Sequence, residues 1–349
     1  MQQKDIISLN HTILSAMKLM DERKRKLLFI TNNDNLFIGV LSIGDLQRAI
    51  INQHPLDTPI EKILRKHITI AHTNQSYEEI RQVMIELRTE SMPVIDDKGY
   101  LKKILYWEDI IGSSQQQEYK KINLPVVIMA GGQGSRLKPL TNVLPKPLIP
   151  ISDKTLIEDI MDSFAKFACK KFYISVNYRA DFIKYYLNNL SDHKYDLNFF
   201  EETKPLGTAG SLHLLEGKIN STFFVTNCDI LIDQDYSEIL QYHYENKNEL
   251  TIVAALKTYS IPYGTIQTGE KGLLKKIKEK PELTFSINTG FYILEPHLLN
   301  EIPKNTFYHI TSLMEKLKSE DRKIGVFPVS ENSWSDIGEW PQYLKLINE

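Results

Sequence analysis

A continuous apolar run that is followed at once by glycines is the feature that most constrains the fold of this chain. Residues 126–130 read VVIMA, and the chain continues as GGQGSRLKPLTNVLPKPLIP up to Pro150. A run without polar alternation is typical of a strand buried on both faces of a parallel sheet. Ligands of such sheets bind beyond the carboxyl ends of the strands. The sequence therefore predicts a ligand-binding loop directly after residue 130.

The glycines of this loop do not fit the two best-known phosphate loops. Gly131, Gly132 and Gly134 let the backbone approach a ligand closely, and their N–H groups can form a nest for an anion. A Walker A loop needs GxxxxGK[ST], which this segment lacks. A dinucleotide fingerprint needs a third glycine where Leu137 stands, so a Rossmann dehydrogenase is disfavoured.

Two isolated cations follow the glycines. Arg136 can grip phosphate oxygens with two parallel hydrogen bonds, and Lys146 supplies a compact positive charge. Pro145 and Pro147 flank Lys146 and stiffen the segment that carries it. This arrangement suits the charge of a triphosphate better than it suits a solvated basic loop.

Strands and helices alternate along the rest of this region. We expect strands at 172–176, 196–200, 222–227 and 250–256, and helices near 155–168, 180–189, 208–215 and 235–246. Such alternation is typical of an α/β domain with a mostly parallel sheet covered by helices.

Composition excludes several other classes of protein. The formal net charge is −2, so the chain has no bulk basic field for nucleic acid or an anionic membrane. Its first residues lack the basic and apolar regions of a signal peptide. No apolar run reaches the roughly 18 residues of a membrane span. Cys169 and Cys228 have no metal-ligand spacing. We expect a cytoplasmic protein that binds neither nucleic acid nor membranes.

An internal repeat precedes a polar linker. Residues 27–50 resemble residues 91–111, because each stretch has two apolar strands, a polar turn and an aspartate that opens a helix. Helical patterns near 12–24 and 76–89 precede them. The repeat resembles a tandem pair of CBS domains, an α+β module. We place the pair at 1–112, with copies at about 1–58 and 59–112, the linker at 113–123 and a second domain at 124–349.

The resemblance to CBS domains implies a nucleotide site at the Ser/Thr-x-x-Asp turn. The first copy has Ser42 and Asp45 at these positions. The second copy has Asp109, but Tyr106 replaces the hydroxyl residue and Lys103 replaces a glycine. The alternatives are a site for a regulatory nucleotide and a degenerate pair that serves packing or dimerisation.

The segment GGQGSRLKPLTNVLPKPL resembles the signature of sugar-1-phosphate nucleotidylyltransferases. Further matches follow in the order of that family: PLGTAGSL (205–212), TNCD (226–229), PYG (262–264), EKP (279–281), INTGFYIL (287–294) and WSDIGEW (334–340). The resemblance implies a Rossmann-like, GT-A-like fold. In this family a sugar 1-phosphate oxygen attacks the α-phosphorus of an NTP, and pyrophosphate leaves.

The same resemblance assigns roles to individual residues. Asp229 and Asp336 would hold Mg²⁺, although GEW follows Asp336 where Gly-Thr-Pro is more usual. Arg136 and Lys146 would stabilise phosphate charge. The other substrate-binding positions are Gly131, Gly132, Gly134 and Gly207 near the nucleotide, Gly264, Glu279 and Asn288 near the sugar, and Lys280 near the sugar phosphate.

The full pattern predicts a homo-oligomeric enzyme that makes a nucleotide sugar for surface-glycan or flagellin glycosylation. Members with a CBS pair resemble glucosamine-1-phosphate guanylyltransferases of legionaminic-acid biosynthesis, so GTP and glucosamine 1-phosphate are favoured. The alternatives are mannose- or heptose-1-phosphate guanylyl transfer and glucose-1-phosphate thymidylyl transfer. A rival from another class is an inactive nucleotide sensor that retains the fold.

Overall fold

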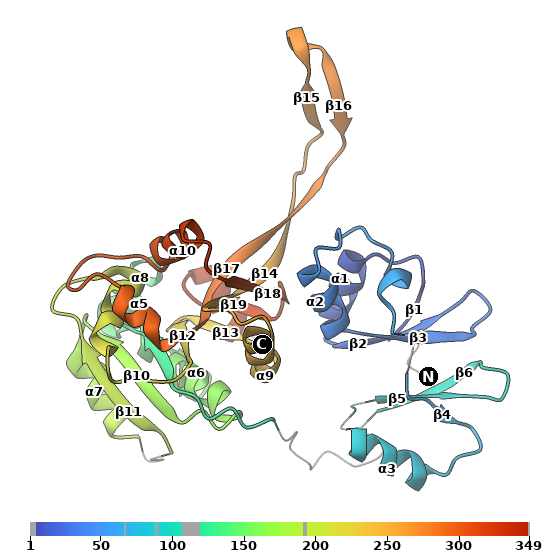
Figure 1. Cartoon of the computed structure of the whole chain (residues 1–349), viewed down its shortest axis with the longest axis horizontal. Helices are drawn as coiled ribbons and strands as arrows, with labels where there is room; N and C mark the ends of the chain where they lie inside the picture. The colour runs from blue at the N-terminus through green and yellow to red at the C-terminus, as the bar shows by residue number, and fades with distance from the viewer. Residues whose placement is uncertain are drawn as a thin grey trace. The chain divides into compact units, whose positions relative to one another are not determined.

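The computed structural model describes residues 5–65, 68–87, 89, 91–106, 119–190 and 194–347. The chain divides into two compact units, Met1–Glu118 and Tyr119–Glu349 (Figure 1). Among the described residues, no helix is both long enough and apolar enough to cross a membrane.

The N-terminal unit has two halves with the same order of strands. The first contains β1 (Ile6–Ser8), α1 (Ile13–Arg23), β2 (Leu27–Thr31), β3 (Phe37–Ser42), α2 (Ile43–Ile51) and the 3-10 helix η2 (Ile60–Ile63); the second contains β4 (Ala71–His72), α3 (Tyr77–Leu87), β5 (Ser91–Ile95) and β6 (Leu101–Tyr106). In each half a parallel pair is followed by an antiparallel hairpin. Leu27 pairs with Ser42, and Ser91 pairs with Tyr106. This shared topology confirms the predicted repeat.

The turn between β3 and α2 is a capping box. The Ser42 side chain accepts a hydrogen bond from the Asp45 backbone N–H at 3.2 Å, and the Asp45 carboxylate accepts one from the Ser42 N–H at 2.9 Å. These bonds satisfy donors that the first turn of a helix leaves unpaired. Ser42 and Asp45 therefore have a structural role before any ligand is considered.

The C-terminal unit is built on a seven-stranded sheet in the order β11-β10-β7-β12-β17-β14-β18. Its strands are β7 (Val126–Met129), β10 (Lys171–Val176), β11 (Asp196–Glu201), β12 (Phe223–Asn227), β14 (Leu250–Ser260), β17 (Glu282–Leu294) and β18 (Ile324–Ser330). Strand β17 runs antiparallel to both neighbours, whereas the other pairs are parallel. The mostly parallel sheet that the sequence predicts is confirmed.

Two-stranded ribbons and helices complete this unit. The ribbons pair β8 (Pro150–Ile151) with β9 (Lys154–Thr155), β13 (Ile230–Ile232) with β19 (Trp334–Asp336), and β15 (Thr265–Thr268) with β16 (Leu274–Lys278). The α-helices are α5 (Leu140–Val143), α6 (Leu156–Ala165), α7 (Ala180–Asn188), α8 (Gly207–Gly210), α9 (Tyr236–Glu245), α10 (Ile310–Ser319) and α11 (Trp340–Ile347). The 3-10 helices are η3 (Ser135–Leu137), η4 (Lys146–Leu148), η5 (Ser211–Leu215), η6 (Glu270–Gly272) and η7 (Pro296–Glu301).

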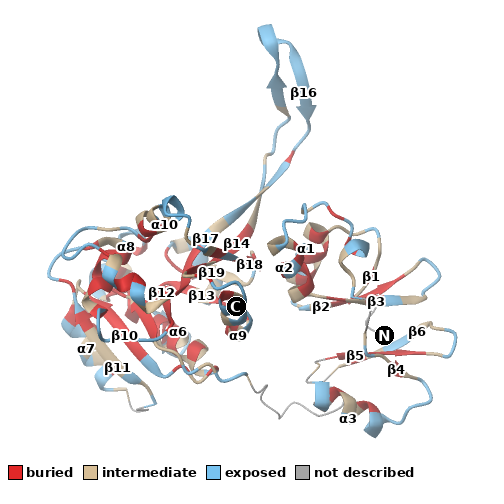
Figure 2. Cartoon of the chain, viewed as in Figure 1, coloured by how far each residue is buried: buried red, intermediate tan, exposed pale blue. Residues whose placement is uncertain are grey.

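The central strands of the sheet consist mainly of buried residues (Figure 2). On one face, Val127 and Val225 belong to a core that also contains Leu212 and Leu313. Successive strand residues point to opposite faces, so the other face is formed by different residues of the same strands. Burying each large apolar side chain stabilises the fold by about 1.5–3 kcal/mol.

An aromatic cluster fills the second face. Phe291 of β17 lies 5.5 Å from Phe164 of α6 and 5.1 Å from Tyr236 of α9, measured between ring centroids. Phe224 of β12 lies 5.4 Å from Phe164. These contacts hold α6 and α9 against the sheet and keep the ends of the central strands in place.

The stretch 208–215 differs from its prediction as a single helix. It forms the short helix α8 and then the 3-10 helix η5. The N–H groups of Ala209 and Gly210 both donate to the Tyr308 carbonyl at 3.0 Å. These donors belong to the first turn of α8, whose N–H groups have no acceptor within the helix, and the stretch continues as a 3-10 helix after Gly210.

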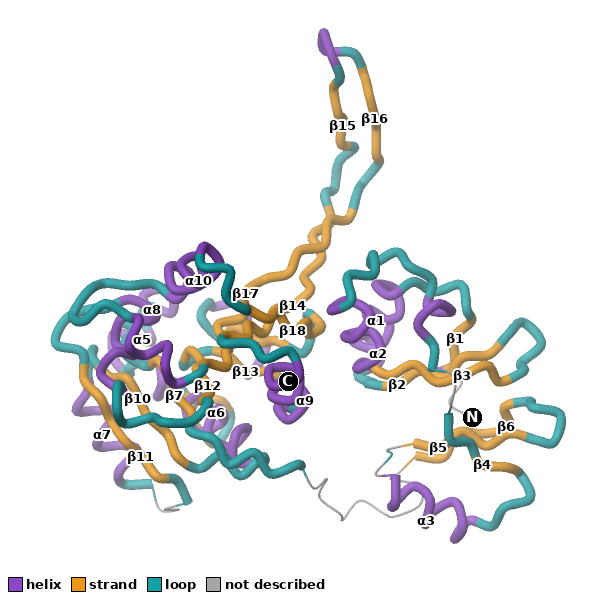
Figure 3. The backbone as a smooth tube through the Cα atoms, viewed as in Figure 1, coloured by secondary structure: helices purple, strands orange, loops and turns teal. Residues whose placement is uncertain are grey.

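A long β-arm projects from the sheet (Figures 1 and 3). Strands β14 and β17 extend together as far as the Ser260–Glu282 pair, and β15 and β16 form the tip of the arm. Apolar side chains on the tip are exposed, with Ile266 at 62%, Leu274 at 63% and Ile277 at 63%. The periodicity that predicted the strand at 250–256 contained no sign of this extension.

Candidate active site

The glycine loop lies at the carboxyl end of β7, where the sequence predicts it. Gly134 has a φ of 63°, and a Cβ there would come within 2.9 Å of the Cβ of Lys146 and the Cγ2 of Thr141. A Cβ on Gly132 would meet no heavy atom within 4 Å. Gly134 therefore allows the loop to pack against the Lys146 segment, while Gly132 borders open space.

Lys146 and Asp229 meet in this region. Lys146 belongs to η4, and Asp229 follows the end of β12. The Lys146 ammonium group donates to Oδ2 of Asp229, and each side chain is only 10% exposed. A buried charge needs a partner of opposite sign, so this pair accounts for the burial of both groups.

Asp336 is brought to the same place by the β13–β19 ribbon. Ile230 pairs with Asp336 in this ribbon, and the Ile337 N–H donates to the Asp229 carbonyl at 2.9 Å. A Cβ placed on Gly338 would lie 2.8 Å from Oδ1 of Asp336 and 3.0 Å from Oδ2 of Asp229. Both carboxylates therefore border one small space beside Gly338.

The electrostatics of this space suit a divalent cation. Burial raises the pKa of Asp336, and the nearby charge of Asp229 raises it further. Among the described residues, no group of three or more His, Cys, Asp or Glu side chains could hold a metal ion. Mg²⁺ is commonly held by one or two carboxylates together with substrate phosphates and waters. Asp229 and Asp336 fit that type of site.

Arg136 completes the charged cluster. Its Nη2 would lie 2.9 Å from a Cβ on Gly338, and its Nη1 donates to the Glu339 carboxylate at 3.0 Å. Trp340 donates through its indole N–H to the Lys138 carbonyl at 2.9 Å. The unusual GEW sequence thus contacts the glycine-loop region directly, which the sequence analysis did not anticipate.

Gly207 is the first residue of α8, and this stretch is hydrogen-bonded to the segment before α10. It has a φ of 81°, and a Cβ there would stand 2.7 Å from the Tyr308 carbonyl oxygen. The Tyr308 N–H donates to the Leu206 carbonyl at 2.8 Å, and the Ile310 N–H donates to the Thr208 hydroxyl at 3.0 Å. Only glycine fits this backbone approach.

Glu202 is a residue of this region that sequence reasoning missed. It follows β11 and is 8% exposed. A Cβ on Gly131 would lie 3.1 Å from Oε1 of Glu202. The available signal was a carboxylate two residues after the expected strand 196–200 and three residues before the start of the PLGTAGSL motif.

The predicted sugar-site residues are separated in this structure. Asn288 lies in the sheet, where its side chain accepts from the Gly290 N–H at 3.1 Å. Gly264 lies between β14 and β15, and Glu279 and Lys280 lie between β16 and β17, all in the arm. A Cβ on Gly264 would be 2.8 Å from the Glu279 carboxylate. Extended backbone joins Lys280 to Asn288, roughly 25 Å at about 3.3 Å per residue. The roles of these residues in sugar binding stay predictions.

The N-terminal unit contains a cavity of about 220 Å³ lined by both halves. Ser42, Asp45, Arg65 and Ser91 contribute to its lining. Arg65 donates to Asp45 at 2.6 Å and to the Ser42 hydroxyl at 3.1 Å. Burial raises the pKa of Asp45, but the bonds from Arg65 and Ser42 outweigh it and the net pKa is lowered. Asp45 is therefore a buried, charged acceptor.

The second half differs at the corresponding turn. Tyr106, which stands where the first half has Ser42, donates to the Asp5 carboxylate. The Arg25 guanidinium lies 4.7 Å from the Tyr106 ring centroid, and its Nε lies 3.5 Å from Asp5. Asp109 lies outside the described residues, so its predicted role stays a prediction.

Comparisons with known proteins match a different family model to each of the two units of the chain. A family model described as nucleotidyl transferase matches residues 125–349, and a CBS domain model matches 3–52 and 60–115. A mannose-1-phosphate guanyltransferase of Yarrowia lipolytica is 34% identical over 233 residues, which cover 62% of this chain and 61% of that protein. The catalytic subunit beta of mannose-1-phosphate guanylyltransferase from Drosophila pseudoobscura is 30% identical, over 62% of this chain and 60% of that protein.

Solved structures show the same fold. HddC from Yersinia pseudotuberculosis matches with a TM-score of 0.52 at 27% identity, covering 64% of this chain and 98% of that one. A putative glucose-1-phosphate thymidylyltransferase from Bacillus anthracis matches with a TM-score of 0.51 at 18% identity, covering 64% of this chain and 94% of that one. The chain spans about 60% of the length of the curated relatives that it matches.

Proposed function

This chain belongs to the nucleotidyl transferase family and carries N-terminal CBS domains, and we propose that it transfers a nucleoside monophosphate from an NTP to a sugar 1-phosphate. The observation that carries the proposal is the convergence of Lys146, Arg136, Asp229 and Asp336 beside the glycine loop. An inactive sensor would have no need to hold these two cations and two carboxylates together, with Lys146 and Asp229 buried as an ion pair.

The proposed reaction needs charge stabilisation and alignment more than it needs a nucleophilic side chain. An oxygen of the sugar phosphate attacks the α-phosphorus, and the bond to the pyrophosphate oxygen breaks. Lys146 neutralises charge at the reacting phosphates, and Arg136 binds the departing pyrophosphate. Glycines of the loop let the nucleotide approach the backbone.

Asp229 and Asp336 would hold Mg²⁺, which when bound neutralises phosphate charge. A cation held there would offset the repulsion between the two carboxylates. Lys146, which pairs with Asp229 in this structure, would contact the substrate phosphates.

For the substrates we favour GTP and glucosamine 1-phosphate. Two of the similar proteins are named as guanylyl transferases, which supports GTP. Because those names specify mannose 1-phosphate, this sugar phosphate is the first alternative, followed by a heptose 1-phosphate; glucose 1-phosphate with dTTP follows these. We also propose that the enzyme is cytoplasmic and that its product supplies surface-glycan or flagellin glycosylation.

We also propose that the chain forms a homo-oligomer and that 1–112 and 124–349 act as separate domains joined by 113–123. Exposed Ile266, Leu274 and Ile277 on the arm support self-association, because apolar patches of this kind commonly mark protein contacts. Sedimentation at several concentrations tests it, and a single monomeric species throughout would contradict it.

The reaction is tested with the full chain, Mg²⁺, a panel of five NTPs (GTP, dTTP, UTP, CTP and ATP) and a panel of sugar 1-phosphates. Pyrophosphate release is followed with time. We expect release to require both substrates and to be greatest with GTP and glucosamine 1-phosphate. Release with no pair in the panel would contradict the proposed function.

A further inference from the structure

The Glu339 carboxylate contacts the charged cluster at the glycine loop, yet the reaction proposed above gives it no role. Glu339 follows Gly338 in the WSDIGEW segment and directly precedes α11. Its Oε1 accepts a hydrogen bond from Nη1 of Arg136 at 3.0 Å. The side chains of Arg136 and Glu339 are 57% and 49% exposed. Because ion pairs that are this exposed contribute little to stability, stability does not explain why a carboxylate stands here.

Each cation of this cluster is paired with a carboxylate of the chain itself. Lys146 is paired with Asp229, and Arg136 is paired with Glu339. Since Asp336 borders the same space, the carboxylates of the cluster outnumber its cations. Asp229 and Asp336 fit a metal site, which leaves Glu339 as the carboxylate without a use. A polyanion that binds to Arg136 meets Glu339 as a competitor that is already in place.

The backbone around Glu339 is held against the segment that follows the glycine loop. The Trp340 indole N–H donates to the Lys138 carbonyl at 2.9 Å, and the Tyr343 hydroxyl donates to the Pro150 carbonyl at 3.2 Å. The Glu339 carbonyl accepts from the Tyr343 N–H at 3.0 Å. Because these bonds fix the backbone, the Glu339 side chain can rotate but stays within its own length of the cluster.

The Arg136 guanidinium reaches from Glu339 to the space beside Gly338. Its Nη2 lies 2.9 Å from where a Cβ on Gly338 would be, and the same point is 2.8 Å from Oδ1 of Asp336 and 3.0 Å from Oδ2 of Asp229. A guanidinium has five N–H donors, and phosphate oxygens commonly bind it through two parallel hydrogen bonds. A phosphate that uses both Nη atoms therefore competes with Glu339 for Nη1.

We propose, on the basis of the nucleotidyl transfer proposed above, that Glu339 is a positioning residue that competes with pyrophosphate for Arg136 and so weakens the binding of this product. The terminal phosphates of the triphosphate displace the carboxylate from Arg136. After transfer, the carboxylate returns to the guanidinium as pyrophosphate leaves, and like charges repel while both are present. Affinity that is equal for substrate and transition state does not raise kcat, so weaker binding of the terminal phosphates leaves the chemical step unchanged and favours release.

The first test measures binding of inorganic pyrophosphate to the full chain by calorimetry in the presence of Mg²⁺. Glu339→Gln and Glu339→Ala remove the charge, and we expect each to lower the Kd for pyrophosphate by about 3- to 10-fold. Glu339→Asp keeps a charge at this position and is expected to stay within about 2-fold of the wild type. Tighter binding distinguishes this role from a structural one, because a damaged site would bind pyrophosphate more weakly.

Initial rates of nucleotide-sugar formation give a second readout. In Glu339→Gln, the KM for the NTP and the inhibition constant for added pyrophosphate are both expected to fall, whereas kcat should not rise with them. Glu216→Gln is the matched control, because Glu216 forms an exposed ion pair with Lys304 in the same unit. We expect Glu216→Gln to keep the wild-type constants.

The outcomes separate this inference from the proposed reaction. Unchanged or weaker pyrophosphate binding in the folded Glu339→Gln and Glu339→Ala chains, as judged by circular dichroism, overturns the role of Glu339 and leaves nucleotidyl transfer standing. Equal tightening in Glu216→Gln overturns it as well, since the effect would then belong to net charge. A chain that shows the expected tightening but transfers with no NTP keeps the competition at Arg136 and overturns the reaction itself.

Discussion

The Lys146 ammonium group is paired with the Asp229 carboxylate, and both side chains are about nine-tenths buried. Removing one partner of such a pair leaves the other charge without compensation, which typically costs about 3–5 kcal/mol. Because Asp336 borders the same space, it can take over part of the contact with Lys146. The pair therefore couples the stability of the C-terminal unit to the chemistry that we assign to this site.

Asp229→Asn is expected to lower turnover by on the order of 10²-fold or more, as for loss of an aligned electrostatic contact. It is also expected to lower the free energy of unfolding of the C-terminal unit by about 3 kcal/mol. Initial rates and urea unfolding of the full chain measure the two effects. Asp181→Asn, at an exposed position in the first turn of α7, is the control. Near-normal turnover in a folded Asp229→Asn chain would contradict the role of this carboxylate.

Gly207→Ala is expected to destabilise the loop at α8 more than Gly217→Ala destabilises its own turn. Both glycines have a positive φ, 81° and 74°. A Cβ on Gly207 would clash with the Tyr308 carbonyl at 2.7 Å, whereas a Cβ on Gly217 would meet nothing within 4 Å. We expect about 1 kcal/mol for Gly217→Ala and about 2–3 kcal/mol more for Gly207→Ala. Equal decreases in melting temperature in the two variants would show that the close approach of Gly207 to the Tyr308 carbonyl adds nothing to the destabilisation.

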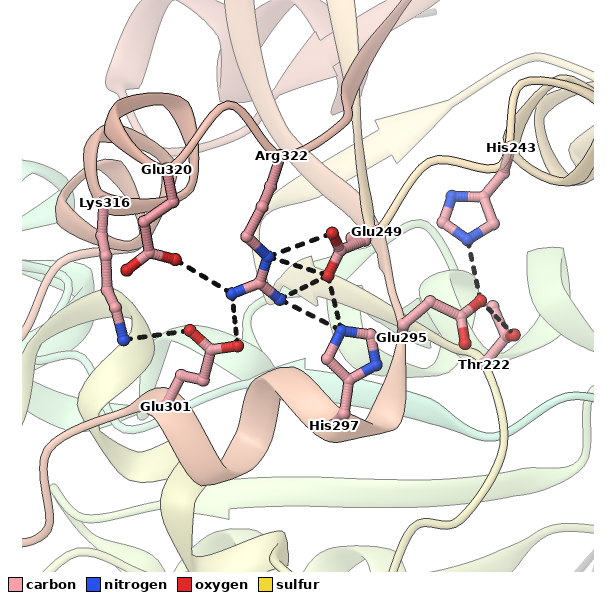
Figure 4. A network of polar contacts seen from close by, with 9 residues as sticks. All are labelled: Thr222, His243, Glu249, Glu295, His297, Glu301, Lys316, Glu320 and Arg322. Carbon is pink, nitrogen blue, oxygen red and sulfur yellow. Dashed lines mark hydrogen bonds and ion pairs between the residues drawn. The ribbon is translucent and has the colours of Figure 1, made fainter.

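Arg322 is the centre of a polar network that joins the segment before β14 to η7 and to the end of α10 (Figure 4). It donates to Glu249 at 3.0 Å and to Glu301 at 2.5 Å, and His297 contacts Glu249 at 2.6 Å. The Arg322 guanidinium lowers the pKa of Glu249 to about 2. Since the folded pKa lies below the unfolded value, this stabilisation is present above about pH 4.5.

The stabilisation from Glu249 is therefore expected to fall as the pH decreases from about 5 toward 2. Arg322→Met should cost roughly 1–2 kcal/mol at neutral pH, because the network is partly exposed. Between pH 5 and 2, the free energy of unfolding of this variant should also decrease less than that of the wild type. Lys318→Met, an exposed cation in the last turn of α10, is the control. Parallel acid-unfolding curves for the wild type and Arg322→Met would rule out this role for the network.

Local patterns in the sequence predict five of the seven strands of the sheet, β7, β10, β11, β12 and β14, whereas β17 and β18 were not among the expected strands. The expected strand at 196–200 and the expected helix at 180–189 coincide closely with β11 and α7. Burial of one face makes apolar residues recur with a different period in a strand and in a helix, so each type can be recognised from its pattern. The glycine loop after residue 130 was also located by this reasoning. These features depend only on residues that are close together in the chain.

Features that join distant segments could not be predicted in this way. The β13–β19 pairing brings Asp336 to Asp229, and only the family resemblance suggested that the two act together. Glu202 acquires its surroundings from Ser175 of β10 and from Gly131 of the glycine loop, which are distant from it in the sequence. Nothing in the periodicity near 260–282 signals the arm, since its exposed strands lack the one-sided apolar face of a packed strand.

The cavity beside Asp45 leads to the last prediction. Asp45 is charged, 6% exposed, and bonded to both Ser42 and Arg65. A ribose hydroxyl that replaces one Arg65 bond would gain a charged acceptor, and the released guanidinium could meet a phosphate. We expect AMP, ATP, GDP or GTP to bind there in the full chain. Asp45→Asn retains the capping geometry but removes the charge, so affinity should fall by roughly 10- to 100-fold.

Calorimetry on the full chain, with initial rates followed in parallel, measures this effect. Asp57→Asn, an exposed carboxylate of the same unit, is the control and should bind like the wild type. A bound nucleotide changes the rate only if it favours one arrangement of the chain over another, so we expect a rate response in the wild type that Asp45→Asn weakens. If no nucleotide binds outside the active site, or if Asp45→Asn binds as tightly as the wild type, Asp45 serves the capping box and its ion pairs, and the N-terminal repeats contribute packing or assembly.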